Sequence, residues 1–349
     1  MNLIRTKYAF LSAYLKGEES RCITHEHYEE MLQRSSIQDM LEVVRDTDIG
    51  DYLWNEQIST FTDTDTSLLK YFDDCLARIQ RFKPPADLTR IMSAYMVRFD
   101  ILNLKIAMRR ILKGGTEETV SFMPLGVIHD EGYLDRLAAA KTIEDVADIV
   151  SACGLHELAS FAKDIKENDE RSHVECEIQL DAHRYTIMRR AFKNVNESHV
   201  VLKALGIIID LNNLQIVFRA ILQEKRNVLL ESLVKGGHIV SIPFLRELLS
   251  MKMAETVSRL EHTEYYPVAQ EVSKLYEKTR NVTVVDRVIE KAKYTLLHEL
   301  LSPRVMSPST ILWYLSVKEW ELRNVRMIVK GFTDGIPASL IREHMVTPS

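Results

Sequence analysis

Histidine and cysteine side chains are the first candidates for metal or nucleophilic chemistry in this chain, and their spacing favours neither. His25 and His27 lie two residues apart, so they would not converge on one face of a helix. Cys153 and His156 lie three residues apart, but no second pair of ligands accompanies them. No CxxC pair occurs among the four cysteines, so neither a zinc ribbon nor a disulfide framework is indicated. We therefore expect no metal site.

Phosphate-binding and catalytic motifs are also missing from the sequence. The Lys-Gly-Gly runs at 113–115 and 235–237 have the wrong order for a P-loop. No G-x-G-x-x-G, G-x-S-x-G or H-E-x-x-H occurs. The sequence thus predicts no catalytic residue and no cofactor. An all-α enzyme with an unrecognised site remains a minor alternative.

A motif that occurs three times is the most specific pattern in the chain. It reads acid, two residues, Asn, an aliphatic residue, one residue, Ile or Met, two apolar residues and a base. The copies lie 110 and 111 residues apart. Their acids, asparagines and bases are Asp100, Asn103 and Arg109; Asp210, Asn213 and Arg219; and Glu321, Asn324 and Lys330.

Weaker recurrences support the same period elsewhere in the chain. An isoleucine followed five residues later by an aromatic residue recurs as Ile23 and Tyr28, Ile128 and Tyr133, and Ile239 and Phe244. In addition, Asp181 matches Asp286, which lies 105 residues further on. A period near 110 is far longer than that of solenoid repeats, so each unit is long enough to hold a core of its own.

The repeated asparagine needs a physical reason, because its amide competes for the backbone inside a helix. Our main interpretation is a buried hydrogen bond that ties the helix to a neighbouring loop. The alternative is that the motif lines an opening that receives a partner, with the acids and bases contributing to the contact. A catalytic role is disfavoured, since a lone amide has no pKa to adjust.

Long helices must carry the motif. Apolar residues around its first copy follow the spacing of one helical face, namely Val97, Ile101, Leu104, Met108 and Ile111. We expect each unit to end in two long helices, spanning 67–82 and 86–113, 175–192 and 197–223, and 282–301 and 309–330. Pro84 and Pro85 should break the first pair, and the Lys-Gly steps at 113–114 and 330–331 should end their helices.

These elements predict an all-α fold of three homologous helical bundles, with boundaries at residues 1–117, 118–227 and 228–349. The scarcity of Gly (12) and Pro (9) also favours long helices over sheets. Trp313 and Trp320, seven residues apart, should lie in the core of the third bundle. The basic cluster at 105–113 is expected to be a solvated face or a set of ion-pair partners.

Charge and hydropathy exclude two classes of partner. The net charge is −5 and no basic stripe is visible, so we expect no nucleic-acid binding. No apolar run approaches 18 residues, because the best one ends at Asp210, so we expect no direct insertion into a membrane. The N-terminal residues lack the pattern of a signal peptide. These features predict a cytoplasmic protein.

Segments along the whole chain carry a resemblance to a known family. Residues 5–15, 28–32 and 46–52 look like the opening of the C subunit of vacuolar-type and archaeal-type rotary ATPases, which is called the d subunit in eukaryotes. The three motif helices resemble the threefold internal repeat of that family, and residues 319–331 with 335–337 resemble its C-terminal signature. Ile49, where the family often has an aromatic residue, and Lys330, in place of Arg, are mild departures.

The resemblance implies a funnel of three helical domains around a pseudo-threefold axis. In the family, the funnel sits on the cytoplasmic face of the membrane proteolipid ring, and its central cavity accepts the foot of the central stalk. It transmits rotation between the ATP-hydrolysing head and the ion-carrying ring and does no chemistry itself. A generic all-helical scaffold or adaptor that binds some other partner is the alternative.

Overall fold

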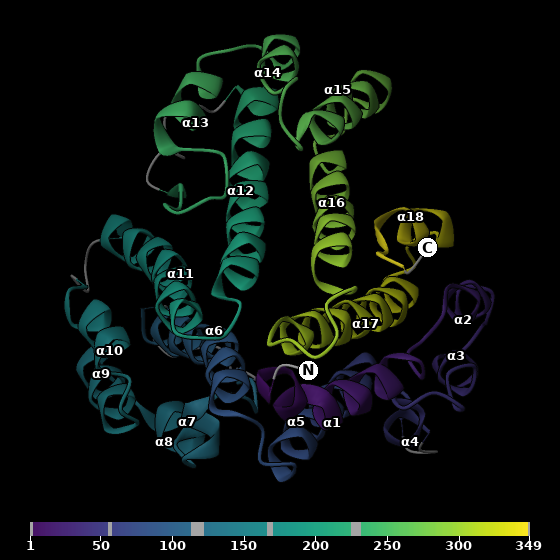
Figure 1. Ribbon diagram of the computed structural model, residues 1–349, viewed down its shortest axis with the longest axis vertical. Coiled ribbons are helices and arrows are strands. Elements are labelled where there is room, and N and C mark those ends of the chain that lie inside the picture. The colour runs from purple at the N-terminus through teal and green to yellow at the C-terminus, as the bar shows by residue number, and fades with distance from the viewer. Residues whose placement is uncertain (1–2, 55–57, 113–121, 166–169, 225–231, 348–349) are drawn as a thin grey trace.

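The computed structural model describes residues 3–54, 58–112, 122–165, 170–224 and 232–347, and within them the fold is all-helical with no strand (Figure 1). This confirms the predicted all-α class. The helices are α1 (Leu3–Glu19), α2 (His25–Met31), α3 (Ile37–Glu42), α4 (Gly50–Leu53), α5 (Phe61–Arg81), α6 (Ala86–Leu112), α7 (Val127–Asp130), α8 (Leu134–Ala139), α9 (Ile143–Ala152), α10 (His156–Lys163), α11 (Glu170–Lys193), α12 (Ser198–Gln223), α13 (Ile242–Leu249), α14 (Met253–Arg259), α15 (Tyr266–Thr279), α16 (Val284–Leu301), α17 (Ser309–Thr333) and α18 (Ala338–His344).

Local sequence signals set many of the helix limits. Threonine caps open α2, α5 and α9, where each hydroxyl accepts the backbone N–H three residues on and the side chain there bonds back to the threonine N–H. The break predicted at Pro84 and Pro85 is confirmed, since α5 ends at Arg81 and α6 begins at Ala86.

The predicted end of the last long helix is wrong by a few residues. α17 continues to Thr333, and Gly331 is buried inside it, where a Cβ atom would lie 2.5 Å from Cδ1 of Ile341. The helix instead ends in a Schellman motif at Gly335, whose φ is +69°. There the N–H of Ile336 bonds to the carbonyl of Gly331. The other Lys-Gly step, at 113–114, lies outside the described residues.

Buried apolar side chains form three clusters, and these do not follow the units of the sequence repeat. The first cluster joins the N-terminal residues up to Tyr95 to side chains of α17 and of the first part of α12. The second runs from Val97 to Leu180, and the third from Ile207 to Ile289. The three motif helices, which carry the copies of the motif, are α6, α12 and α17. The motifs of α6 and α12 pack with residues that follow them in the chain, whereas α17 packs with the N-terminal residues. The boundaries at 117 and 227 stay a prediction.

Ion pairs or hydrogen bonds join each motif helix to a long helix of another predicted unit. α6 packs on α11, α12 on α16 and α17 on α5 (Figure 1). At equivalent positions of the repeat, Lys105 Nζ lies 2.5 Å from Asp181, Gln215 Nε2 lies 2.7 Å from Asp286, and Arg326 bonds to Asp65. The third pairing connects the end of the chain to its beginning, so the order of contacts closes on itself.

One helix in the described part of the chain, α12, is long and apolar enough to cross a membrane. Asp210 interrupts the apolar run, as the sequence indicates, but a single charged residue does not prevent α12 from meeting this criterion of length and composition. Within the chain, 67% of that stretch is buried. Core helices pass the same test, so α12 is weak support for a membrane span.

Trp313 provides a test of the packing between α16 and α17. Its ring contacts Tyr294 and Trp320, and its Nε1 donates to Glu19 of α1 at 2.9 Å. We expect Trp313→Ala to lower the free energy of unfolding by about 3–5 kcal/mol, because it leaves a cavity in the core. Trp54→Ala, at a residue that is 44% exposed, should cost about 1 kcal/mol or less. Equal losses in denaturant titrations would contradict this assignment of the core.

Candidate partner-binding cavity

The motif acids of the first two copies are buried against the loops that follow them. Asp100 accepts the backbone N–H of Ile128 at 2.9 Å. Asp210 accepts three successive N–H groups, the shortest from Ile239 at 2.8 Å, together with a tyrosine hydroxyl. Close approach requires glycine, since a Cβ atom on Gly237 would lie 1.6 Å from Asp210 Oδ1. Two of the isoleucines that recur in the sequence, Ile128 and Ile239, thus donate their backbone N–H groups to the motif acids.

The third acid makes the same contact with the first residues of the chain and adds a buried cation. Glu321 Oε1 accepts the N–H of Ile23 at 2.7 Å. Its other oxygen lies 3.1 Å from the Nζ of Lys318, which also lies 2.6 Å from Asp48 and 3.1 Å from the Sγ of Cys22. Burial alone would lower the pKa of Lys318, but the charges of Glu321 and Asp48 outweigh this and hold it above its usual value.

This buried cluster has the spacing of a metal site but already contains its cation. Oxygen and sulfur atoms of Cys22, Asp48 and Glu321 lie within 4.8 Å of one another. The ammonium group of Lys318 hydrogen-bonds to all three, and Lys318 is fully buried. The two other motif copies have an aliphatic residue at the position of Lys318. We interpret the cluster as an internal ion network that fixes α17 to the N-terminal helices.

The three motif asparagines make one repeated contact. In each, Nδ2 donates to a backbone carbonyl and Oδ1 accepts the N–H of the same residue, over distances of 2.7–3.2 Å. The pairs are Asn103 with Met123, Asn213 with Val234, and Asn324 with Val346. All three side chains are buried. The interpretation of the asparagine as a hydrogen bond to a neighbouring loop is confirmed.

The motif bases form ion pairs at the surface. The pairs are Arg109 with Glu177 at 2.6 Å, Arg219 with Asp286 at 2.8 Å, and Lys330 with Asp334 at 2.9 Å. Exposed pairs of this kind contribute about 0–1 kcal/mol each. The first two pairs join neighbouring helices, α6 to α11 and α12 to α16. The third pair stays local, at the C-terminal end of α17. In the basic cluster predicted at 105–113, Lys105, Arg109 and Arg110 are ion-pair or hydrogen-bond partners, as expected, and residue 113 lies outside the described residues.

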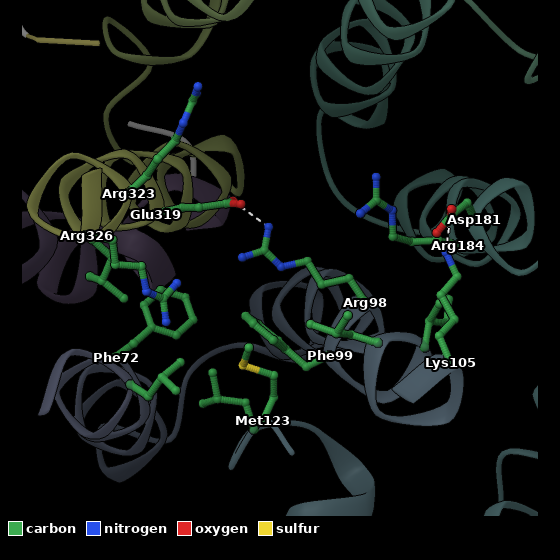
Figure 2. A pocket seen from close by; sticks show the side chains of 15 residues that line it. Phe72, Arg98, Phe99, Lys105, Met123, Asp181, Arg184, Glu319, Arg323 and Arg326 are labelled. Carbon is green, nitrogen blue, oxygen red and sulfur yellow. Dashed lines mark hydrogen bonds and ion pairs between the residues drawn. The ribbon is translucent and has the colours of Figure 1, made fainter. Parts of the chain in front are cut away.

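A pair of adjoining cavities lies between the motif helices, on the side opposite to the buried acids. One, of about 430 Å³, lies between α5, α6, α11 and α17. The other, of about 200 Å³, lies between α6, α11, α12, α16 and α17. They share Arg98, Arg184, Glu319 and Arg323. We call the two together the central cavity, and Figure 2 shows the larger one from close by.

Ion pairs organise the walls of the central cavity. Arg98 of α6 and Glu319 of α17 point toward each other and lie 2.5 Å apart (Figure 2). Burial would raise the pKa of Glu319, but the charge of Arg98 and hydrogen bonds from Tyr95 and Arg98 outweigh it and lower the pKa. Oε2 of Glu290 on α16 accepts a hydrogen bond from Nη1 of Arg323 at 2.6 Å. Apolar side chains such as Phe72, Phe99 and Met123 complete the larger part.

The lining residues occupy equivalent positions in the three motif copies but differ in type. One position, two residues before the acid, holds Arg98, Ile208 and Glu319, and another, one before the asparagine, holds Leu102, Asn212 and Arg323. None of the nine motif residues predicted from the sequence lines the cavity. A role for them in partner binding stays a prediction. One sequence signal could have indicated the lining. Positions 98, 102 and 105 follow the i, i+4, i+7 spacing of one helical face, and this face lies opposite to the motif.

Comparisons with known proteins agree over nearly the whole chain. The model of a family described as ATP synthase (C/AC39) subunit matches residues 11–344. A protein of Methanocaldococcus jannaschii, named as the C subunit of an A-type ATP synthase, is 24% identical over 351 residues, which cover 97% of this chain and 86% of that protein. Proteins of the same name from Pyrococcus abyssi and Methanosphaera stadtmanae are 22% and 21% identical, over 97% of this chain and 90% and 88% of theirs. The matched region includes all three motifs and the cavity lining.

The asparagine contact can be tested on two adjacent residues of α12. Asn213→Ala removes both hydrogen bonds to Val234 and leaves two backbone groups unpaired, so the free energy of unfolding should fall by about 2–4 kcal/mol. Asn212→Ala, which removes a single bond to Tyr185 from a half-buried side chain, should cost about 1 kcal/mol. Amide exchange of Val234 should accelerate in the first variant only. Similar exchange and stability in both would show that the contact is not structural.

The buried acid of the first motif predicts a pH dependence of stability. Burial raises the pKa of Asp100 from 3.8 to about 6, so the folded chain binds an extra proton between these values. Stability must therefore fall as the pH rises from 4 to 6, by up to about 3 kcal/mol for this group. Asp100→Asn keeps an acceptor for Ile128 but cannot ionise, so its stability relative to the wild type should improve between pH 4 and pH 7.

Thermal unfolding of both proteins across this pH range measures the difference. Asp135→Asn is the control, because this carboxylate is exposed at the start of α8. The stability of the control relative to the wild type should not improve as the pH rises. A constant gap between wild type and Asp100→Asn from pH 4 to pH 7 would contradict the proton uptake assigned to Asp100.

Proposed function

Because the chain belongs to the ATP synthase (C/AC39) subunit family, we propose that it is the coupling subunit in the central rotor of a V-type/A-type rotary ATPase. It is an accessory subunit without a catalytic site of its own. In this role it links the central stalk to the membrane proteolipid ring and transmits torque for ATP-driven ion transport or ATP synthesis.

The observation that carries the proposal is the central cavity between the three motif helices. Equivalent positions of all three helices line its smaller part, so a side chain seated there would touch α6, α12 and α17 together. Its larger part is lined by α6 and α17 but not by α12. We infer that the three helical parts surround a shared pseudo-threefold axis as a funnel, and that the foot of the central stalk enters along this axis. The lining combines apolar side chains with charged ones, and a partner contact needs both packing and polar complementarity.

Stiffness against twisting is the second requirement of a coupler, and the contacts between units supply it. Each motif helix is fixed by a buried acid and a buried asparagine, and on α17 the acid bonds to Ile23 near the start of the chain while the asparagine bonds to Val346 near its end. Removing one partner of a buried ion pair such as Lys318 with Asp48 typically costs about 3–5 kcal/mol. Torque applied to one unit would therefore pass to the others without local unfolding.

Placement on the membrane follows from the same proposal. The chain would lie on the cytoplasmic side and contact the membrane only through the proteolipid ring. The burial of 67% of the apolar stretch of α12 supports its role as a core helix. In this arrangement no segment of the chain enters the bilayer.

Binding measurements with the cognate proteins of the central stalk and with the solubilised proteolipid ring test the proposal. The wild-type chain should bind both at once. Asn212→Trp, which fills the cavity at α12, should weaken stalk binding roughly tenfold or more, equivalent to about 1.4 kcal/mol, and leave ring binding intact. Lys141→Trp, at an exposed position, is the matched control. A wild-type chain that binds neither component would overturn the proposal and favour an adaptor for another partner.

A further inference from the structure

The central cavity carries a charge opposite to that of the chain as a whole. Six cationic and three acidic side chains line it, namely Arg98, Lys105, Arg184, Lys293, Arg323 and Arg326 against Asp181, Glu290 and Glu319. The chain has a net charge of −5. A cavity with one predominant sign and protein walls concentrates the field inside it, so it attracts ligands of the opposite sign.

The acids of the lining are already engaged by its own cations. Lys105 pairs with Asp181, Arg98 with Glu319, and Lys293 and Arg323 share Glu290. These pairs leave Arg184 and Arg326 as the remaining cations. Arg326 pairs with Asp65 of α5 but keeps a buried Nη2 atom without a hydrogen bond. The excess positive charge is thus located on α11, which carries Arg184, and where Lys293 of α16 and Arg323 of α17 share the single carboxylate of Glu290.

Among the described residues that line the cavity, Arg184 is the one cation that has no ion pair with a carboxylate. Among the residues that the structure describes, its only hydrogen bond is to the hydroxyl of Tyr185, no carboxylate lies within 4.0 Å, and its Nε is buried and unbonded. It lines both parts of the cavity, and Figure 2 shows it extending from α11. A guanidinium group with free donors in a confined site is suited to a planar carboxylate.

Resting on the proposed function, we propose that the stalk segment that enters the cavity presents an acidic face and that one of its carboxylates pairs with Arg184. The apolar lining by Phe72, Phe99 and Met123 favours a protein segment over a free anion, because it would contact the side chains beside the carboxylate. On the α12 wall, Ile208 and Asn212 are uncharged. The acidic face therefore lies toward α11 and α17.

The test measures stalk affinity for three variants of the full chain. Arg184→Gln should weaken binding roughly tenfold and Arg184→Glu roughly a hundredfold, because the latter places like charges together. Arg246→Glu, with the same charge change at an exposed site on α13, should stay within about twofold of the wild type. Wild-type affinity should also fall as the salt concentration rises from about 0.05 M to about 0.5 M. Reversing the matching acid of the stalk to lysine should restore binding to Arg184→Glu.

The outcomes separate this inference from the proposed function. Stalk binding that is unchanged in Arg184→Glu and insensitive to salt would overturn the acidic face while leaving the coupling role in place. Inorganic phosphate that binds the stalk-free chain tightly at Arg184 would also overturn it, by making the cavity a small-anion site. Failure of the stalk to bind the wild-type chain would instead overturn the proposed function. Thermal unfolding of each variant checks that its fold is intact.

Discussion

The contact between a buried carboxylate and the backbone N–H groups of a distant loop is the constraint on which the rest of this structure depends. A motif acid without those donors would be a buried charge with no compensation, which is too costly for a marginally stable chain. The neighbouring asparagine bonds to a second loop and thereby fixes the rotation of the helix about its axis. With one face fixed in this way, the opposite face of each motif helix is held toward the cavity.

The third copy shows how the same contact can close the chain. Glu321 reaches the N–H of Ile23, 298 residues away, and a single donor replaces the three that Asp210 receives. Lys318 supplies the missing stabilisation, and Asp48 balances its charge. Bringing chain ends together costs conformational entropy that grows slowly with separation. A buried ion network combined with the first hydrophobic cluster offsets this cost.

Sequence periodicity predicted the helices and the role of the asparagine, but not which segments touch. The period near 110 indicated that Ile23, Ile128 and Ile239 are equivalent, as are the three acids. A repeat shows which positions are equivalent but not which copy packs on which. Only the structure shows that the third motif contacts the N-terminal residues and not the residues that follow it. Gly331 was misplaced as a helix end because close packing against Ile341, rather than a turn, requires a glycine there.

The residues that line the cavity were not predicted, because they are not conserved in type among the three copies of the repeat. The copies share the residues that specify the fold and differ in those that face the cavity, as Arg98, Ile208 and Glu319 show. A repeat search finds only the first set. For a coupler the difference is useful, since three identical walls would accept an occupant in three rotational positions. Walls of unlike charge favour one position, and rotation of the occupant then requires rotation of the whole chain.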